Sequence, residues 1–181
     1  MATNYETLYQ TERHALGQPT KAFVSFFESL PASSLTVVDV GCGQGRDSLF
    51  IARLGHQVTS IDISPTGIKQ LLEDAGAEGL SITGIVADLS EYQFIASYDI
   101  AVVDRTLHML APELRLNLLA RVMKVISAEG YILIADEPRN LPAMLELFTQ
   151  DAGWQVMKHQ QGFLFVRKAT YTESACIPNN A

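Results

Sequence analysis

Residues 37–47 constrain the fold of this chain more than any other segment. They read Val-Val-Asp-Val-Gly-Cys-Gly-Gln-Gly-Arg-Asp, which is the end of a buried strand, a glycine turn and the start of a helix. Asp62 follows the next apolar run, residues 56–61. A strand end, a turn whose backbone a ligand can approach closely and a carboxylate for ribose hydroxyls together predict a nucleoside-binding site.

The spacing of the glycines argues against a dinucleotide. The dinucleotide fingerprint G-x-G-x-x-G would need a glycine at position 46, where this chain has Arg46, and the third glycine is Gly45. An NAD-dependent oxidoreductase on the same architecture is therefore the less favoured alternative.

With this turn and Asp62, the chain resembles the class I (Rossmann-like) S-adenosylmethionine-dependent methyltransferases, whose turn reads G-x-G-x-G. Within them, Gly-Arg-Asp-Ser at 45–48 and Leu-Gly-His-Gln-Val at 54–58 are similar to the small tellurite-resistance (TehB-like) and thiopurine-type enzymes. The resemblance extends over about residues 20–168. It implies S-adenosylmethionine as the methyl donor and S-adenosylhomocysteine as the product.

The resemblance also implies which residues contact the donor. The expected set is Asp39, Gly41, Cys42, Gly43, Gly45, Asp62, Ile63, Asp88, Leu89 and Asp104. Asp62 would accept hydrogen bonds from the ribose diol, the alternative being a helix cap, a position that Ser64 already fills. Asp88 would meet the adenine amino group unless it is a solvated loop carboxylate. Asp39 would contact the amino group of the methionine moiety or brace the turn, and Cys42 is expected to be a small buried residue rather than a nucleophile.

Residues for the acceptor and for catalysis are predicted after the fourth strand and near the N-terminus. His108 is the candidate general base, with a structural partner for a backbone group as the alternative, and Asp104 is the second catalytic candidate. Arg46 and Arg105 would hold the acceptor, although Arg46 would equally suit a surface position. Tyr5 and Tyr9, together with His14, form a lid over the site or a satellite packing cluster.

The order of apolar and polar segments predicts an α/β fold in one domain, over residues 1–181. Strands are expected at 35–40, 56–61, 82–87, 98–103 and 131–135, and a hairpin at 155–159 and 163–167. Helices are expected near 20–30, then at 48–54, 65–76, 112–126 and 141–151. This alternation predicts a mostly parallel sheet between two layers of helices. The resemblance implies seven strands, with an antiparallel C-terminal hairpin, in a three-layer Rossmann-like methyltransferase sandwich. We expect an N-terminal lid and helix over 1–30, a core over 35–168 and a loose tail over 169–181.

Composition narrows the partners. The net charge of −7 argues against nucleic acid, because phosphate neutralisation needs a basic face. No apolar run approaches the roughly 20 residues of a membrane helix, and no apolar leader segment is visible. Two cysteines suit a reducing cytoplasm, and the four histidines show no metal-ligand spacing. The sequence makes no prediction of the oligomeric state.

The sequence thus predicts a cytoplasmic enzyme that transfers a methyl group from S-adenosylmethionine to a small molecule. The acceptor could be a thiol, a metalloid, or a small amine or hydroxyl compound. The second hypothesis is a non-catalytic protein that binds S-adenosylmethionine as a sensor or assembly partner, which would bind the donor without turnover.

Overall fold

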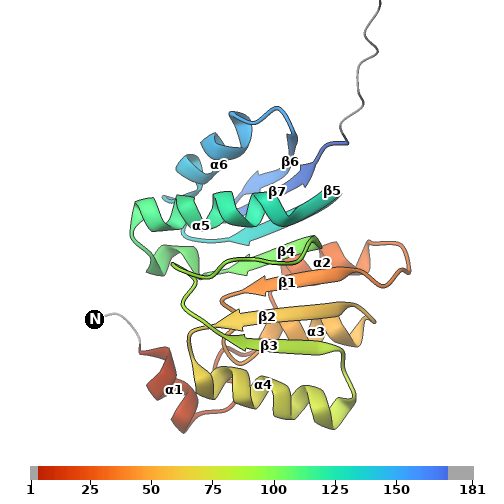
Figure 1. Cartoon of the computed structure of the whole chain (residues 1–181), viewed down its shortest axis with the longest axis vertical. Coiled ribbons are helices and arrows are strands. Elements are labelled where there is room, and N and C mark those ends of the chain that lie inside the picture. Colours follow the sequence, from red (N-terminus) through yellow and green to blue (C-terminus); the bar gives the residue numbers. More distant parts are fainter. Residues whose placement is uncertain (1–3, 171–181) are drawn as a thin grey trace, which may run out of the picture.

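A computed structural model describes residues 4–170 of the chain as a seven-stranded sheet flanked by helices (Figure 1). The strands are β1 (Thr36–Val40), β2 (Gln57–Asp62), β3 (Ile82–Val86), β4 (Tyr98–Asp104), β5 (Ile126–Ala135), β6 (Trp154–Gln160) and β7 (Phe163–Lys168). Their order across the sheet is β3-β2-β1-β4-β5-β7-β6, and only the pairings of β7 with β5 and with β6 are antiparallel. The predicted parallel sheet with a C-terminal antiparallel hairpin is confirmed.

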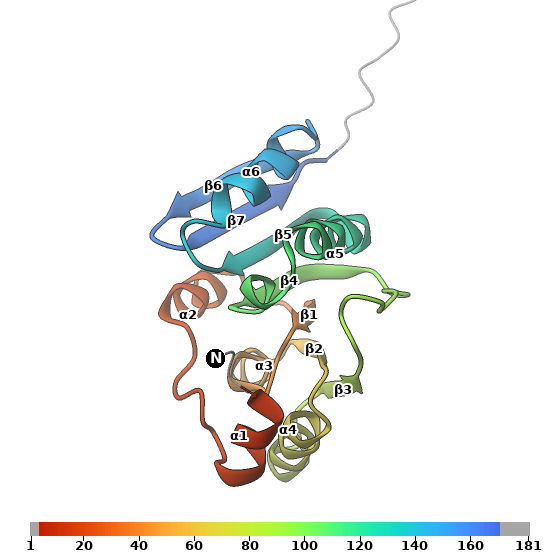
Figure 2. The same ribbon diagram turned by 90° about the vertical axis from the view of Figure 1, so that its left-hand side faces the viewer.

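Helices cover both faces of the sheet. They are α1 (Tyr5–Thr11), α2 (Lys21–Glu28), α3 (Arg46–Arg53), α4 (Pro65–Glu78), the one-turn η1 (Leu107–Met109), α5 (Pro112–Val125) and α6 (Leu141–Thr149). Figure 2 shows α2 and α3 on one side of the sheet and α5 on the other. α1 lies beside α4 in both views, at the edge of the sheet formed by β3. Within residues 4–170, none of these helices combines the length and the apolarity needed to cross a bilayer.

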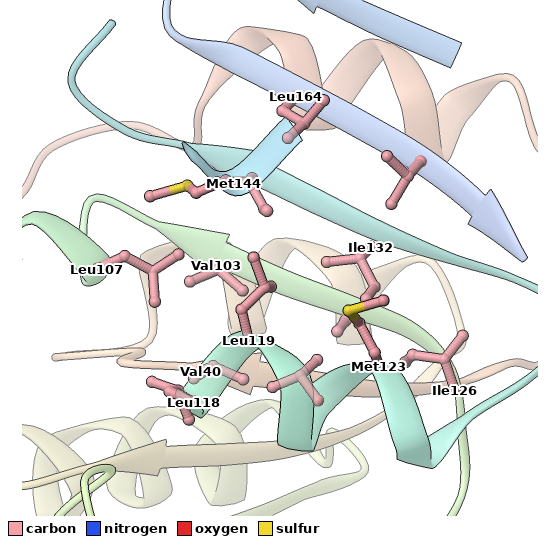
Figure 3. Packing of buried hydrophobic residues seen from close by; sticks show 14 of the residues in the cluster. Val40, Val103, Leu107, Leu118, Leu119, Met123, Ile126, Ile132, Met144 and Leu164 are labelled. Carbon is pink, nitrogen blue, oxygen red and sulfur yellow. The ribbon is translucent and has the colours of Figure 1, made fainter. Parts of the chain in front are cut away.

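The largest core cluster lies between the sheet and α5 (Figure 3). Leu118, Leu119 and Met123 project from α5 toward Val103 of β4 and Ile132 of β5. All five side chains are buried. Leu119 and Met123 are four residues apart, so they lie on the same face of α5.

A second cluster fills the opposite face of the sheet. Phe23 and Phe27 of α2 and Ile51 of α3 pack there against Val37 and Val102. Val37 and Val38 belong to different clusters because successive residues of a strand point to opposite faces of the sheet. Burial on both faces explains why β1 reads as a nearly continuous apolar run.

Several predicted boundaries differ from those of the structure, and two of the differences have a clear physical reason. The helix expected to stop at Gly76 continues to Glu78, and Gly79 ends it with a φ of 68°. Gly76 and Gly79 both fit the glycine that commonly ends a helix. The helix ends at Gly79, because the next residue, Leu80, donates from its backbone N to Ala75 O at 2.9 Å. The strand expected at 131 begins at Ile126, immediately after α5, and its pairing with β4 shifts register before Tyr131.

The N-terminal segment contains a helix that was not among those expected from the sequence. Residues 5–11 form α1, whose N-cap Asn4 accepts a hydrogen bond from Thr7 N. Only Tyr9 of this helix is buried, so the helix depends on tertiary contacts rather than on an apolar stripe of its own. Most of the predicted tail, residues 171–181, lies outside the described part of the chain.

An aspartate stands within two residues of the carboxyl end of every parallel strand. Asp39 is the penultimate residue of β1, Asp62 and Asp104 end β2 and β4, and Asp88 and Asp136 follow β3 and β5. Because these strands run in one direction, all five carboxylates lie toward the same edge of the sheet. We refer to Asp39, Asp62, Asp88, Asp104 and Asp136 as the aspartate row.

Candidate functional site

A cavity of about 440 Å³ opens at the carboxyl ends of β1 to β4. The predicted residues that line it are Tyr5, Tyr9, Gly41, Arg46, Asp62, Ile63, Asp88, Leu89, Asp104 and Arg105. The remaining lining residues, which the sequence did not single out, are Leu16, Ser90, Thr106, Met109, Leu110 and Leu114. We refer to this space as the first cavity. Asp39, Cys42, Gly43, Gly45 and His108 do not line it.

The glycine turn is tightly covered. Gly41, Gly43 and Gly45 have φ values of 82°, 55° and 80°, a region that side chains disfavour. A Cβ at Gly41 would overlap the side chain of Thr106, and one at Gly43 would overlap the hydroxyl of Tyr9. The sequence requirement for glycine at these two positions is therefore both conformational and steric. Cys42 is buried within the turn, where burial raises the pKa of its thiol.

Asp62 joins the glycine turn to the start of α4. Its Oδ2 accepts a hydrogen bond from Gly43 N and its Oδ1 one from Ser64 N, both at 2.8 Å. Burial raises the pKa of Asp62, and the two N–H donors oppose that shift. A carboxylate oxygen has two lone pairs, so each oxygen keeps one for a ligand hydroxyl. Ser64 caps α4 by accepting from Gly67 N, as the sequence predicts.

Asp88 and Leu89 border the cavity after β3. Asp88 is exposed, and hydrogen bonding from Ser90 lowers the pKa of its carboxyl, so that it is an ionised acceptor at neutral pH. Leu89 is buried, whereas Ile63 after β2 leaves 65% of its surface exposed. These side chains together provide two apolar surfaces and one hydrogen-bond acceptor.

Asp39 lies beneath the glycine turn, out of contact with the cavity. Ser48 Oγ donates to Asp39 Oδ2 at 2.5 Å, and Ser60 Oγ donates to Ser48 at 2.8 Å. Burial raises the pKa of Asp39 to about 8, with a further contribution from the negative charge of Asp47. Through Ser48 the Asp39 side chain connects the end of β1 to α3, and both roles considered for Asp39 stay predictions.

Asp104 is held by a cluster of polar side chains. Its Oδ2 accepts from Thr20 Oγ1 at 2.5 Å and pairs with Arg46, whose Nη2 also lies 2.7 Å from Asp47 Oδ2. The Asp104 side chain is only 5% exposed, and burial raises its pKa against the opposing effects of Thr20 and Arg46. Arg46 is thus committed to two aspartates rather than free at the surface.

The second oxygen of Asp104 has no partner. Asp104 Oδ1 is buried and makes no hydrogen bond within residues 4–170, and Arg105 Nε is 3.9 Å away. A buried, unsatisfied carboxylate oxygen is costly, and one on a cavity wall is suited to a donor group of a ligand.

The N-terminal segment is fastened over the turn by polar contacts. Glu6 accepts from Ser64 Oγ at 2.5 Å and from Thr66 Oγ1 at 2.6 Å, at the start of α4. Gln44 of the turn donates to the carbonyl of Glu12 at 2.7 Å and accepts from Ala15 N at 2.9 Å. The N-terminal segment thereby forms part of the wall of the first cavity.

Tyr5 and Tyr9 face the cavity from this segment, with ring centroids 5.8 Å apart. Tyr9 is buried, which raises the pKa of its hydroxyl. His14 instead lies outside the cavity lining, with Nε2 3.7 Å from Asp74. Tyr9 has features of both alternatives. Its hydroxyl lies over Gly43, as in a lid, and its side chain is buried, as in a packing cluster.

His108 faces a second cavity of about 270 Å³, bounded by η1, the end of β5 and the turn between β6 and β7. Arg105 lines both cavities. The backbone N of His108 donates to Asp136 Oδ2 at 2.9 Å. Asp136, like Thr20 and Thr106, was not predicted as a site residue, although it follows a parallel strand, as Asp88 does. Over residues 4–170 no three His, Cys, Asp or Glu side chains are arranged to hold a metal ion.

Comparison with known proteins relates the chain to methyltransferases. A family described as "Methyltransferase domain" matches residues 37–130. A probable S-adenosyl-L-methionine-dependent methyltransferase TehB of Haemophilus influenzae is 29% identical over 140 residues, which cover 71% of this chain and 49% of that protein. A ubiquinone biosynthesis O-methyltransferase of Xylella fastidiosa is 31% identical over 144 residues, covering 66% and 57% of the two chains. The chain thus spans about half the length of these curated relatives.

Solved structures share the fold. The crystal structure of Haemophilus influenzae TehB has a TM-score of 0.71 at 21% identity, covering 83% of this chain and 62% of that one. Magnesium protoporphyrin IX methyltransferase from Synechocystis, solved with bound S-adenosylmethionine, has a TM-score of 0.72 at 15% identity and covers 93% and 99%.

Proposed function

Because the chain belongs to the methyltransferase domain family of class I S-adenosylmethionine-dependent enzymes, with TehB-like relatives, we propose that it transfers a methyl group from S-adenosylmethionine to a small molecule. One observation carries the proposal. Three carboxylates of the aspartate row, Asp62, Asp88 and Asp104, converge on one cavity that begins at the glycine turn. Their spacing along the strand ends suits a ligand with a polar group at either end and a diol between them.

The nucleoside half of the donor fits the side of the first cavity formed by β2 and β3. The Asp62 oxygens are fixed by backbone N–H donors and retain lone pairs for the two ribose hydroxyls. Ile63 and Leu89 offer apolar surface for a flat ring, and Asp88 offers an acceptor for an exocyclic amino group. A ligand without the diol would leave the half-buried Asp62 carboxylate with fewer hydrogen bonds, which favours ribose-containing ligands.

The amino-acid half fits the side formed by β1 and β4. Asp104 Oδ1, which has no hydrogen-bond partner among the described residues, would accept from an ammonium group, and Arg46, although paired with Asp47 and Asp104, would add a positive charge near a carboxylate. Gly41 lines this side of the cavity with its backbone alone, and a side chain at this position would overlap Thr106.

The donor supplies a methyl group bound to a cationic sulfur, which is already activated for transfer. The contribution of the chain is then to position the acceptor and to exclude water. Tyr9 and Leu16 close the cavity from the N-terminal segment, and Met109 and Leu110 close it from η1 and the residue after it. These four side chains would keep water out of the first cavity.

A small acceptor is favoured over a nucleic acid by the charge and by the cavities. The chain carries a net charge of −7, and the aspartate row lies at the edge where the acceptor must enter. The second cavity adjoins the first through Arg105 and has room for a small molecule. Cytoplasmic location remains our expectation from the cysteine content.

The test is a calorimetric titration of the purified chain with S-adenosylhomocysteine, beside NAD as the control ligand. We expect saturable binding of S-adenosylhomocysteine and none of NAD. Binding of NAD alone would refute the proposal in favour of the oxidoreductase. Binding of S-adenosylhomocysteine without transfer to any acceptor in a screen of thiols, metalloids, amines and hydroxyl compounds would favour the non-catalytic sensor.

A further inference from the structure

His108 presents its two ring nitrogens to different surroundings. Nδ1 is buried, makes no hydrogen bond within the described residues and lies 4.0 Å from Asp136 Oδ2. The side chain as a whole is 28% exposed and lines the second cavity. The accessible part of the ring therefore includes the Nε2 side, and the buried Nδ1 faces a carboxylate.

Asp136 is fixed in this position from three directions. Its Oδ2 accepts from His108 N at 2.9 Å, and its Oδ1 accepts from Glu137 N at 2.8 Å and Asn140 Nδ2 at 2.6 Å. Its side chain is fully buried. A small rotation of the His108 ring would bring Nδ1–H into hydrogen-bonding range of Oδ2. Contacts of this kind are often long in a ligand-free site and shorten when the site fills.

We propose that the second cavity binds the methyl acceptor, that the reacting group of the acceptor is a hydroxyl, and that His108 Nε2 removes its proton. Asp136 is then a positioning residue that holds the Nδ1–H tautomer. This inference rests on the proposed function, and it narrows the acceptor from thiols, metalloids and amines to hydroxyl compounds. A thiolate, a reduced metalloid or a neutral amine attacks through a lone pair that it already has and needs no base in the transfer step, so nothing would then be gained from a histidine oriented by a buried carboxylate.

The transfer balances with these residues alone. The hydroxyl proton passes to His108 Nε2 while the oxygen lone pair forms the new bond to the methyl carbon. The carbon–sulfur bond breaks with its electron pair staying on sulfur, which becomes a neutral thioether. The imidazolium, stabilised by Asp136, then returns its proton to solvent.

The connection between the cavities supports this placement. η1 contributes Met109 to the first cavity and His108 to the second, and Arg105 borders both. Arg115 of α5 holds η1 in place by donating to the carbonyl of Leu107 at 2.9 Å. The charged groups around His108 are Asp136, Arg105 and Glu137, and Glu137 is paired with Arg139 at 2.6 Å. Phe163 and Pro138 give the second cavity an apolar wall that suits an aromatic ring.

Phenol and thiophenol test the inference as a matched pair, because thiophenol loses its proton far more readily than phenol. Transfer of radiolabelled methyl to each is measured for the wild type and for H108A, H108Q, D136N and H159A. His159 is exposed and lines neither cavity, so H159A is the control. For phenol we expect kcat to fall about 100-fold or more in H108A and H108Q, and by a smaller factor in D136N. For thiophenol we expect kcat close to the wild-type value in every variant. Added imidazole should restore part of the phenol activity of H108A.

An NMR titration with phenol tests the same inference without requiring turnover. In protein saturated with S-adenosylhomocysteine, the Cε1–H NMR signal of His108, identified by its absence in H108Q, should shift when phenol is added, while that of His159 should not. Equal losses for phenol and thiophenol in H108Q, or no shift of the His108 signal with phenol, would overturn the inference and leave the proposed function standing. Failure of S-adenosylhomocysteine to bind the wild type would instead refute the proposed function.

Discussion

Replacement of Asp39 by Asn tests the electrostatics beneath the glycine turn. Burial raises the pKa of Asp39 from 3.8 to about 8 in the folded chain. Between these two values the native state holds a proton that the unfolded state has lost. The free energy of unfolding of the wild type should therefore fall as the pH rises through this window, by about 1.4 kcal/mol per pH unit.

The size of the effect follows from the window. From pH 5 to pH 8 the wild type should lose about 4 kcal/mol of stability through this one group, relative to D39N, whose amide does not titrate. Any change in the hydrogen bond with Ser48 shifts the D39N curve by a constant amount, so it does not affect the difference in slope. Above about pH 8 the two curves should become parallel, since Asp39 is then ionised in both states.

Urea unfolding of the ligand-free chain at pH 5, 6, 7 and 8 measures this difference. The matched control is E28Q, because Glu28 is exposed and makes no ion pair or hydrogen bond among the described residues. We expect the E28Q curve to run parallel to the wild type. Parallel curves for D39N and the wild type would refute the reasoning, because they would mean that Asp39 is ionised in the native state throughout the range.

Three further predictions concern the donor site and the core. D62A should weaken S-adenosylhomocysteine binding about 10- to 100-fold, since charged hydrogen bonds are lost, and an unchanged calorimetric affinity would remove Asp62 from the site. G43V should abolish that binding, because the branched side chain conflicts with the φ of 55° and with the Tyr9 hydroxyl, and retained binding would show that the ligand does not use the turn. L119A should lower the free energy of unfolding by about 2–5 kcal/mol, because Leu119 is fully buried. L72A is the control and should lower it much less, because Leu72 is half-exposed, and equal decreases in the two variants would contradict the packing described.

The fold was largely predictable because its signals are local. The alternation of strands and helices depends on short apolar runs and on turn residues, and each is visible within about ten positions. α1 was missed because a helix of seven residues with one buried side chain has no periodicity of its own to detect. The early start of β5 was missed because Gly130 indicates a turn, whereas in the structure it allows close approach of the Asp99 carbonyl.

Part of the lining of the first cavity was predictable from the ends of the strands. Asp62 and Asp104 end β2 and β4, Asp88 stands two residues after β3, and all three line the first cavity. The roles of Thr20 and Asp136 were not predictable, because each depends on a partner far along the chain. Thr20 meets Asp104 across 84 positions, and Asp136 approaches a hairpin turn that begins near Gln161.

The aspartate row affects the binding of the methyl donor and the release of its product differently, because only the donor carries a positively charged sulfur. Among the Lys and Arg residues of the described part of the chain, only Arg46 and Arg105 border the two cavities, so the negative potential of the ionised aspartates at this sheet edge is only partly neutralised. Such a potential attracts cations over roughly 8–10 Å at physiological salt and has little effect on neutral sulfur. The positively charged donor would be drawn in, whereas the product, which has lost that charge, would be retained less strongly. Raising the ionic strength should therefore narrow the difference in affinity between donor and product.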